Sequence, residues 1–238
     1  MRIDCWSTSL QKRVFDVTLS IFILSLAIVI GAIAFVLVKL TSKGPALFCQ
    51  RRVGFDGHLF TLYKFRTMVT NSSGIGLTRD GDARLTKVGR FLRKLKLDEI
   101  PQFYNVLRGD MSLVGPRPKL PEYAVATDWA YRPGITGFAT LVFRREEEML
   151  RDVPAEKLTA FYGAEIKSFK ARLDRWYMRR ASLASDVGVI WKTAAACLMP
   201  GPLRLPKPAR QVRIPVSNPV WISDQDGLSM SMETESVD

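Results

Sequence analysis

The sequence predicts an α/β protein, mostly α with short β pieces, that carries a membrane-embedded helix near its N-terminus. Two observations predict this class: residues 17–38 contain no charged side chain, and the later segments switch between strand-like alternation and helical spacing of apolar residues. With 238 residues, the chain is long enough for one main domain with a sizeable core. We therefore divide it into a membrane helix with its flanks (1–43), a cytosolic domain (44–199) and a tail (200–238).

The apolar segment 17–38 has the length of a membrane helix. Its 22 residues match a hydrocarbon core of roughly 30 Å at the rise of an α-helix. A cleaved signal peptide has a shorter apolar core followed by small residues at the cleavage site, whereas this run continues directly into KLTSKGPALF. We expect the segment to stay attached to the domain that follows.

Basic residues flank this segment on both sides, because Lys12 and Arg13 precede it and Lys39 and Lys43 follow it. The positive-inside rule therefore does not orient a simple spanning helix. Equal basic flanks suit a re-entrant helix, whose two ends both lie on the cytoplasmic side, but such a helix needs a bend. The residues that could provide the bend are Ser20, Ser25 and Gly31. Taken alone, the residues leave both geometries open.

The chain carries a formal charge of +12, from 35 Lys and Arg against 23 Asp and Glu. This excess favours anionic partners: nucleic acid, phospholipid headgroups or phosphorylated substrates. The three cysteines, Cys5, Cys49 and Cys197, are odd in number and far apart, which argues against a disulfide framework and a structural zinc site and indicates a reducing compartment. Because His58 is the single histidine, mechanisms built on a histidine base have little support.

Residues 44–68 are predicted to form short β-rich pieces around turns. Apolar and aromatic residues alternate with polar ones there, and the tetrapeptide FDGH is a hairpin-like turn signal. The segment 71–82 is rich in Gly, Ser and Asp, which predicts a loop. At the other end, residues 200–238 change to Pro and basic residues and then to an acidic stretch, which predicts a disordered tail.

An amphipathic basic helix is predicted from Thr86 to about Leu95, where apolar residues recur at helical spacing and most of the Lys and Arg lie on the other side. The pattern fits either an interfacial helix on a membrane or an ordinary helix with a solvated face. A second helix is predicted from Glu99 to Arg108, with Gly109 ending it. Further helical spacing is found in 144–180 and 182–199.

Asp98 and Glu99 stand side by side after a run of basic residues. One interpretation makes Asp98 a helix N-cap and nothing more, because the backbone N–H groups at a helix start favour negative charge. The other interpretation is a phosphate site with its metal ligand. It is favoured by two turn-rich motifs that follow, GDMSLVGPRP with Arg117 and YRPGITG with Arg132.

Several of these motifs, in this order, resemble the bacterial sugar transferases, the monotopic phosphoglycosyl transferases that act on polyprenyl phosphate. The resemblance covers most of residues 12–140 and is most specific over 97–118. The similar stretches are KRVFD, SKGPALFCQRRVG, FTLYKFRTM, LRKLKLDEIPQFYNVLRGDMSLVGPRP and YRPGITG. Members with a re-entrant membrane helix usually carry Ser-Pro at its bend, whereas this chain has Ser25-Leu26. The resemblance nevertheless favours the re-entrant geometry.

The resemblance implies transfer of a sugar 1-phosphate from a UDP-sugar to undecaprenyl phosphate, with release of UMP, as the first membrane step of exopolysaccharide or related glycan synthesis. It implies membrane lipid as a further partner, no nucleic acid, and a catalytic domain on the cytoplasmic face of the bacterial inner membrane; homo-oligomerisation is left open. In the family, the residue matching Asp98 is the nucleophile and the residue matching Glu99 helps to hold Mg²⁺. The phosphate-binding candidates are Arg93, Arg117, Lys64, Arg66 and Arg132.

The chemistry expected of the pair follows from its geometry. Adjacent helix positions point about 100° apart, so Asp98 can face phosphorus while Glu99 faces a cation. Attack by Asp98 would give an acyl-phosphate, and we expect surrounding cations to keep this carboxylate ionised by lowering its pKa. The competing interpretations are direct transfer without a covalent step and a non-catalytic, membrane-anchored basic adaptor that binds anionic lipid or nucleic acid.

Overall fold

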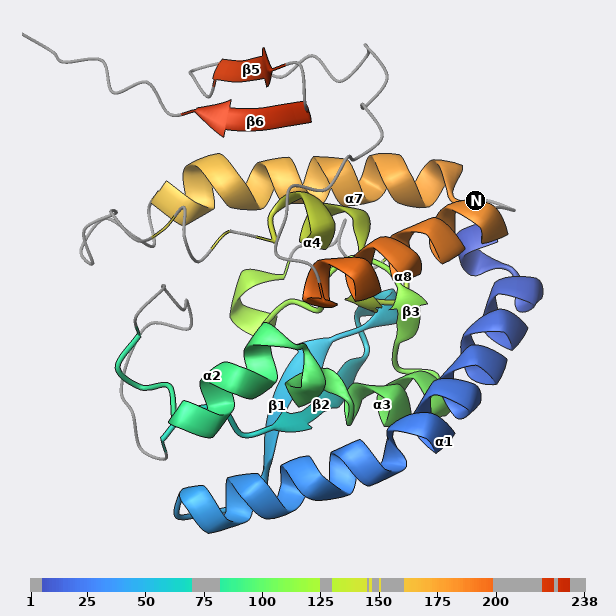
Figure 1. Ribbon diagram of the computed structural model, residues 1–238. Helices are drawn as coiled ribbons and strands as arrows, with labels where there is room; N and C mark the ends of the chain where they lie inside the picture. The colour runs from blue at the N-terminus through green and yellow to red at the C-terminus, as the bar shows by residue number, and fades with distance from the viewer. Residues whose placement is uncertain are drawn as a thin grey trace, which may run out of the picture.

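The computed structural model is mostly helical, with short strands and one long apolar helix near the N-terminus (Figure 1). It describes residues 6–69, 82–124, 130–144, 146, 150, 161–198, 220–224 and 227–231. The α-helices are α1 (Leu10–Thr41), α2 (Lys87–Lys94), α3 (Gln102–Arg108), α4 (Phe138–Val142), α7 (Ser168–Arg180) and α8 (Leu183–Leu198). The strands are β1 (Leu47–Val53), β2 (Leu59–Phe65), β3 (Ser112–Val114), β4 (Gly134–Thr136), β5 (Val220–Asp224) and β6 (Gly227–Ser231). The predicted loop at 71–82 lies, apart from Asp82, outside the described residues.

Helix α1 is longer than the uncharged segment on both sides. It begins after Ser9, whose hydroxyl accepts a hydrogen bond from the Lys12 amide at 3.1 Å. In the part of the chain that the structure describes, α1 is the one helix long and apolar enough to cross a membrane, judged by length and composition. Figure 1 shows that α1 is bent: it descends one side of the molecule and then runs beneath α2, β1 and β2. The Ser25 hydroxyl donates to the Phe22 carbonyl at 2.8 Å, a local contact of the kind that bends helices.

Both ends of α1 are bound to the body of the protein, whereas its middle is exposed. Near the N-terminal end, the Arg13 guanidinium donates to the carbonyls of Val106 and Leu107 at 2.6 and 2.9 Å. Near the other end, Ala34 and Val38 are each 2% exposed. They belong to a cluster with Ala46, Phe65, Leu92 and Ile100. The exposed apolar residues of the middle are Ile21, Phe22, Leu26, Ile28, Val29, Ile30 and Ile33.

Strands β1 and β2 form the predicted hairpin. They pair antiparallel from Leu47 opposite Phe65 to Val53 opposite Leu59. The turn between them contains Asp56 and Gly57 with φ of 57° and 77°, the left-handed conformation that Asp tolerates and Gly adopts freely. The turn signal at FDGH is thus confirmed.

A short parallel pair, β3 and β4, was not predicted, because each strand has only three residues inside a stretch of Gly and Pro. Ser112 pairs with Gly134 and Val114 with Thr136. The two backbones approach so closely that a Cβ on Gly115 would lie 2.4 Å from the Arg132 carbonyl oxygen. This glycine therefore allows the loop after β3 to lie against the segment before β4.

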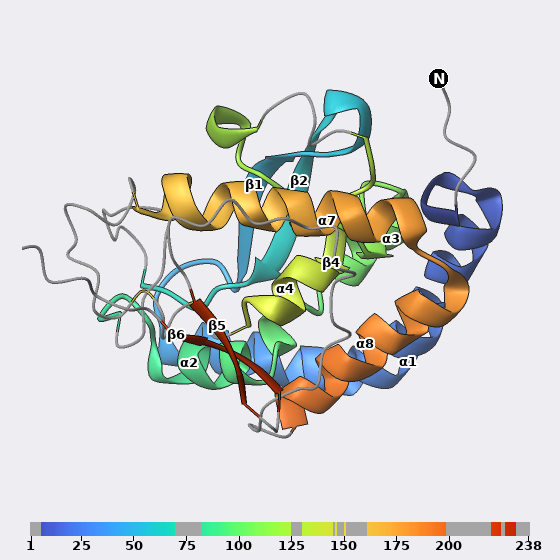
Figure 2. The same cartoon turned by 90° about the horizontal axis from the view of Figure 1, so that it is seen from above.

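Helices α4, α7 and α8 close the main core over β3 and β4 (Figures 1 and 2). The two predicted C-terminal helical segments are confirmed by α7 and α8 within the described residues. The core side chains include Leu62, Val106, Met111, Val114, Phe138, Leu173 and Val189. Val106, Phe138, Leu173 and Val189 come from one helix each, and the others come from β2, β3 and the residue before β3.

The described part of the tail contains a strand pair that was not predicted. Residues 220–224 and 227–231 form an antiparallel hairpin, β5 and β6, with Val220 opposite Ser231 and Asp224 opposite Gly227. GLSMS alternates in polarity, as is typical of a strand. The disorder of the tail stays a prediction. The other residues of 200–238 lie outside the described part.

Candidate active site

The acidic pair lies on a tight turn between α2 and α3. Helix α2 begins after Thr86, the predicted start of the helical pattern, and the Thr86 hydroxyl caps it by accepting from the Gly89 amide at 2.8 Å. After α2 the chain turns at Lys96, whose φ of 58° is unusual for a residue with a side chain. A 3₁₀ turn, Leu97–Glu99, then carries the pair.

Two details of the sequence prediction are corrected here. The second helix begins at Gln102 rather than Glu99, with Pro101 at its N-cap. Lys96 is the N-cap of the 3₁₀ turn, and neither cap makes a side-chain hydrogen bond. Asp98 is therefore not a helix N-cap, because it lies inside the 3₁₀ turn, where successive side chains point about 120° apart.

Both carboxylates are buried, and their surroundings differ. Asp98 is 5% exposed, and its Oδ1 atom has no hydrogen-bond partner among the described residues. Glu99 is 8% exposed, and its Oε1 atom lies 3.6 Å from Lys96 Nζ and 3.8 Å from Arg117 Nη1. A buried, unpartnered carboxylate oxygen is costly unless a ligand completes its contacts, which marks Asp98 as a functional candidate.

The two pKa values move apart. Burial raises the pKa of Asp98, and the negative charge of Glu99 raises it further, against the opposing effect of nearby cations. The prediction that cations lower the pKa of Asp98 is therefore wrong for the isolated chain, because burial outweighs them. For Glu99, burial also disfavours the charge, but Lys96 and Arg117 outweigh it and lower the pKa. Such a divergence is typical of paired carboxylates with distinct roles.

Four cations from different parts of the chain lie around the pair. Lys96 and Arg117 form the two ion pairs with Glu99. Burial and the guanidinium of Arg93 lower the pKa of Lys64 to about 8, against the opposing charge of Asp98. Arg93 donates through Nε to the Thr67 hydroxyl at 3.1 Å and also acts on the pKa of Asp98. The structure thus brings Lys64, Arg93 and Arg117 to the acidic pair.

The structure does not bring the other two phosphate-binding candidates to the pair. The buried Arg66 guanidinium donates to the carbonyls of Pro45 and Ser42 and to the Ser42 hydroxyl, which ties down the end of α1. Arg132 donates through Nε to the Gly109 carbonyl at 3.2 Å and lies over the Phe55 ring at 5.2 Å. These placements argue against a phosphate role and give both arginines structural contacts.

Sequence reasoning missed a second charged group beside Arg117. Lys170 on α7 pairs with Glu146 at 2.5 Å and lies over the rings of Phe143 and Tyr162. Burial lowers the pKa of Lys170, and the charge of Arg117 lowers it as well, which places the two cations within electrostatic range. No local pattern could reveal this group, because its members come together only when α7 docks.

The donor atoms fit a magnesium ion that is completed by substrate. Mg²⁺ prefers oxygen ligands and is usually held by one or two carboxylates together with substrate phosphates. Glu99 supplies an ionised carboxylate, and the unpartnered Asp98 Oδ1 lies on the neighbouring residue. Within the described residues there is no cluster of three or more His, Cys, Asp or Glu, so a fully protein-made cage is not found there.

Comparison with known proteins identifies the family of this chain. The sequence pattern described as bacterial sugar transferase matches residues 7–200. The chain belongs to the bacterial sugar transferase family. It is 36% identical over 199 residues to an undecaprenyl-phosphate glucose phosphotransferase of Komagataeibacter xylinus, covering 77% of this chain and 35% of that protein.

The chain matches different shares of two further relatives. A UDP-glucose:undecaprenyl-phosphate glucose-1-phosphate transferase of Escherichia coli is 37% identical over 200 residues, covering 77% of this chain and 39% of that protein. The uncharacterized sugar transferase EpsL of Bacillus subtilis is 38% identical over 194 residues, covering 79% of this chain and 87% of that protein. The chain thus spans well under half of two of these relatives and most of the third.

Proposed function

We propose that this family member transfers a sugar 1-phosphate from a UDP-sugar to undecaprenyl phosphate and releases UMP. The observation that carries the proposal is the buried, unpartnered Asp98 carboxylate beside an ionised Glu99, with four cations around them. Such a site suits a diphosphate donor, whose negative charges the cations balance. The names of two relatives, which specify undecaprenyl-phosphate and transfer of a sugar phosphate, support the same reaction.

The proposed reaction has two displacements at one phosphorus atom. A carboxylate oxygen of Asp98 forms a bond to the sugar-bearing phosphorus, and the bond from that phosphorus to the UMP oxygen breaks. UMP leaves with the electron pair. A phosphate oxygen of the lipid then attacks the same phosphorus and releases the Asp98 carboxylate. Arg117, Lys96, Lys64 and Arg93 bind the phosphate oxygens and stabilise the charge that develops on them.

Glu99 is proposed to hold Mg²⁺ together with the diphosphate oxygens. When bound, the ion supplies positive charge that favours ionised Asp98 and a good leaving group. We expect Glu99→Gln to raise the Mg²⁺ concentration needed for half-maximal transfer by at least about tenfold, because an amide oxygen lacks the negative charge. Titration of activity with Mg²⁺ measures this shift. An unchanged titration, with the protein folded and membrane-bound, would remove Glu99 from the metal site.

A re-entrant arrangement of α1 in the membrane is proposed on the basis of its contacts. Arg13 near one end and Ser42 just beyond the other both bind the same body, through α3 and through Arg66. Two ends held by one cytosolic domain lie on one side of the bilayer. The exposed apolar middle would then enter one leaflet, which holds the site at the surface where the lipid substrate lies.

We expect both ends of α1 to lie on the cytoplasmic side of the inner membrane. In a background without native cysteines, Thr8→Cys and Thr41→Cys should both be protected from an impermeant maleimide in intact spheroplasts, and both should react after lysis. Both positions are exposed on the protein, so protection reports the membrane. Labelling of position 8 alone in intact spheroplasts would establish a spanning helix with an external N-terminus.

Release of UMP from a panel of UDP-sugars tests the proposed function. The membrane-bound protein is incubated with each UDP-sugar, Mg²⁺ and undecaprenyl phosphate, and we expect at least one sugar to give UMP and a diphosphate-linked lipid. If no sugar gives UMP while the protein binds anionic vesicles in a salt-sensitive way, the adaptor interpretation replaces the enzymatic one.

A further inference from the structure

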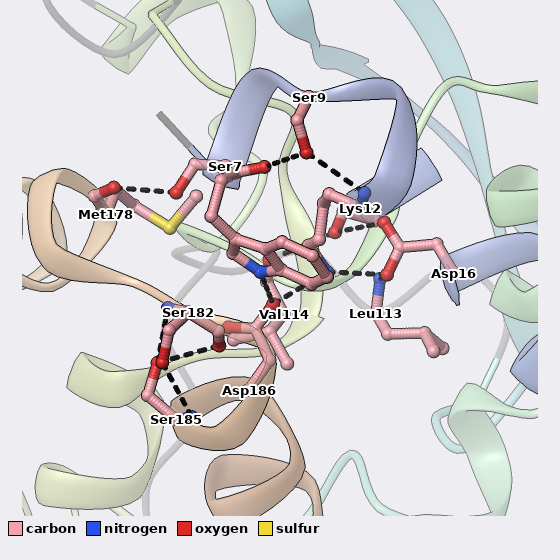
Figure 3. A network of polar contacts seen from close by, with 12 residues as sticks. Ser7, Ser9, Lys12, Asp16, Leu113, Val114, Met178, Ser182, Ser185 and Asp186 are labelled. Carbon is pink, nitrogen blue, oxygen red and sulfur yellow. Dashed lines mark hydrogen bonds and ion pairs between the residues drawn. The ribbon is translucent and has the colours of Figure 1, made fainter. Parts of the chain in front are cut away.

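A buried charge network joins the start of α1 to α8 and β3 (Figure 3). Lys12 lies between two carboxylates, 2.5 Å from Asp16 and 3.0 Å from Asp186. Lys12, Asp16 and Asp186 are 3%, 2% and 1% exposed, so the three charged groups are shielded from water. The proposed chemistry uses none of them.

The two carboxylates share Lys12 as a donor, and their remaining donors come from different elements. Asp186 accepts from Lys12, from Trp6 Nε1 at 2.9 Å and from the Tyr177 hydroxyl at 2.7 Å. Asp16 accepts from Lys12 and, through its other contacts, from β3 alone. These are the Ser112 hydroxyl at 2.7 Å and the Leu113 amide at 3.3 Å.

Strand β3 leads directly to the cation that faces Glu99. Only Gly115 and Pro116 separate its last residue from Arg117. The Gly115 amide donates to Thr136 at 2.9 Å, and the Gly134 amide donates to Pro116 at 2.9 Å. The close contact at Gly115 leaves the loop little freedom, so a shift of β3 at Ser112 reaches Arg117 through a short, well-bonded segment.

We propose that Asp16, on the membrane helix, is a positioning residue for Arg117: by holding Ser112 and Leu113 it couples the seating of α1 to the geometry of the phosphate-binding loop. The inference rests on the proposed function. It gives the network a role beyond stability. Buried ion clusters are often no more stabilising than apolar side chains of the same size, so stability alone is a weak reason for three buried charges.

Two hydroxyls of the network provide a matched pair of variants. Ser112→Ala removes the hydroxyl that binds Asp16, and Tyr177→Phe removes the one that binds Asp186; both bonds are 2.7 Å long and buried. We expect similar losses of melting temperature. We expect Ser112→Ala to lower kcat for transfer about tenfold, because small displacements of a phosphate-binding group cost that much, and Tyr177→Phe to leave kcat close to the parent value.

A double-mutant cycle with Arg117→Ala decides whether the effect passes through Arg117. If Asp16 acts through Arg117, Ser112→Ala causes little further loss of kcat in the Arg117→Ala background, and Asp16→Asn behaves in the same way where it folds. Tyr177→Phe is the control, with the same small effect in both backgrounds. The inference would be overturned if Ser112→Ala lowered kcat by the same factor in the Arg117→Ala background as in the parent. Equal effects of Ser112→Ala and Tyr177→Phe on kcat would also overturn it.

The cycle also separates this inference from the function on which it rests. A parent protein that releases UMP, combined with multiplicative losses, contradicts the positioning role alone. A parent protein that releases no UMP from any UDP-sugar contradicts the proposed function, and the positioning role falls with it.

Discussion

Asp98→Asn is expected to lower sugar-phosphate transfer by at least about a thousandfold, because an amide oxygen is a far weaker nucleophile than a carboxylate of the same shape. The variant should remain folded. The Asp98 Oδ1 atom has no partner among the described residues, and burial raises the pKa of this carboxyl. Replacing a buried, poorly solvated charge by a neutral group is therefore expected to leave the melting temperature equal to or above that of the parent protein.

Transfer rates and thermal melts of the parent and the variant measure both parts of this prediction. Glu99→Gln is a suitable comparison, because it also removes one buried carboxylate but leaves the proposed nucleophile in place. A large loss of melting temperature for Asp98→Asn would give Asp98 a structural role. Substantial residual transfer in a folded variant would remove it from the chemistry.

Arg117→Ala is expected to lower transfer about 100-fold, and Arg117→Lys about tenfold. A guanidinium can bind two phosphate oxygens in parallel, whereas an ammonium acts as a point charge. Arg117 lies 3.8 Å from Glu99, and its side chain is 57% exposed, so truncation removes little packing. We therefore expect both variants to stay folded.

Arg132→Ala is the matched control for the arginine series, because the Arg132 guanidinium is bound to Gly109 and lies over Phe55 rather than at the acidic pair. We expect Arg132→Ala to lower the melting temperature and to leave the transfer rate of the folded protein close to that of the parent. Equal and small effects of Arg117→Ala and Arg117→Lys on transfer would show that Arg117 is not a phosphate ligand.

Much of the fold could be predicted from the sequence because the patterns that indicate its strands and helices are local. The hairpin of β1 and β2 follows from alternation around FDGH, and α2 follows from the helical spacing of apolar residues that starts at Thr86. The pair Asp98 and Glu99 could also be singled out, since two adjacent acids in a basic run are visible without any structure.

The properties that were not predictable depend on contacts between distant segments. Burial of Asp98 arises from the packing of α1, α2 and β2 around one turn, so its raised pKa could not be predicted from nearby cations. Arg66 stands in a motif with Lys64, but it lies just beyond the last residue of β2, and its guanidinium binds the end of α1 instead. The link from Asp16 to Ser112 joins positions 96 residues apart.

The covalent step at Asp98 is tested most directly by incubating the protein with a UDP-sugar and Mg²⁺ in the absence of lipid. The proposed mechanism predicts release of UMP up to about one equivalent per protein and a hydroxylamine-sensitive sugar-phosphate mass on the peptide that contains Asp98, both absent in Asp98→Asn. UMP release that strictly requires undecaprenyl phosphate, with no adduct on Asp98, would contradict it and favour direct transfer in a ternary complex.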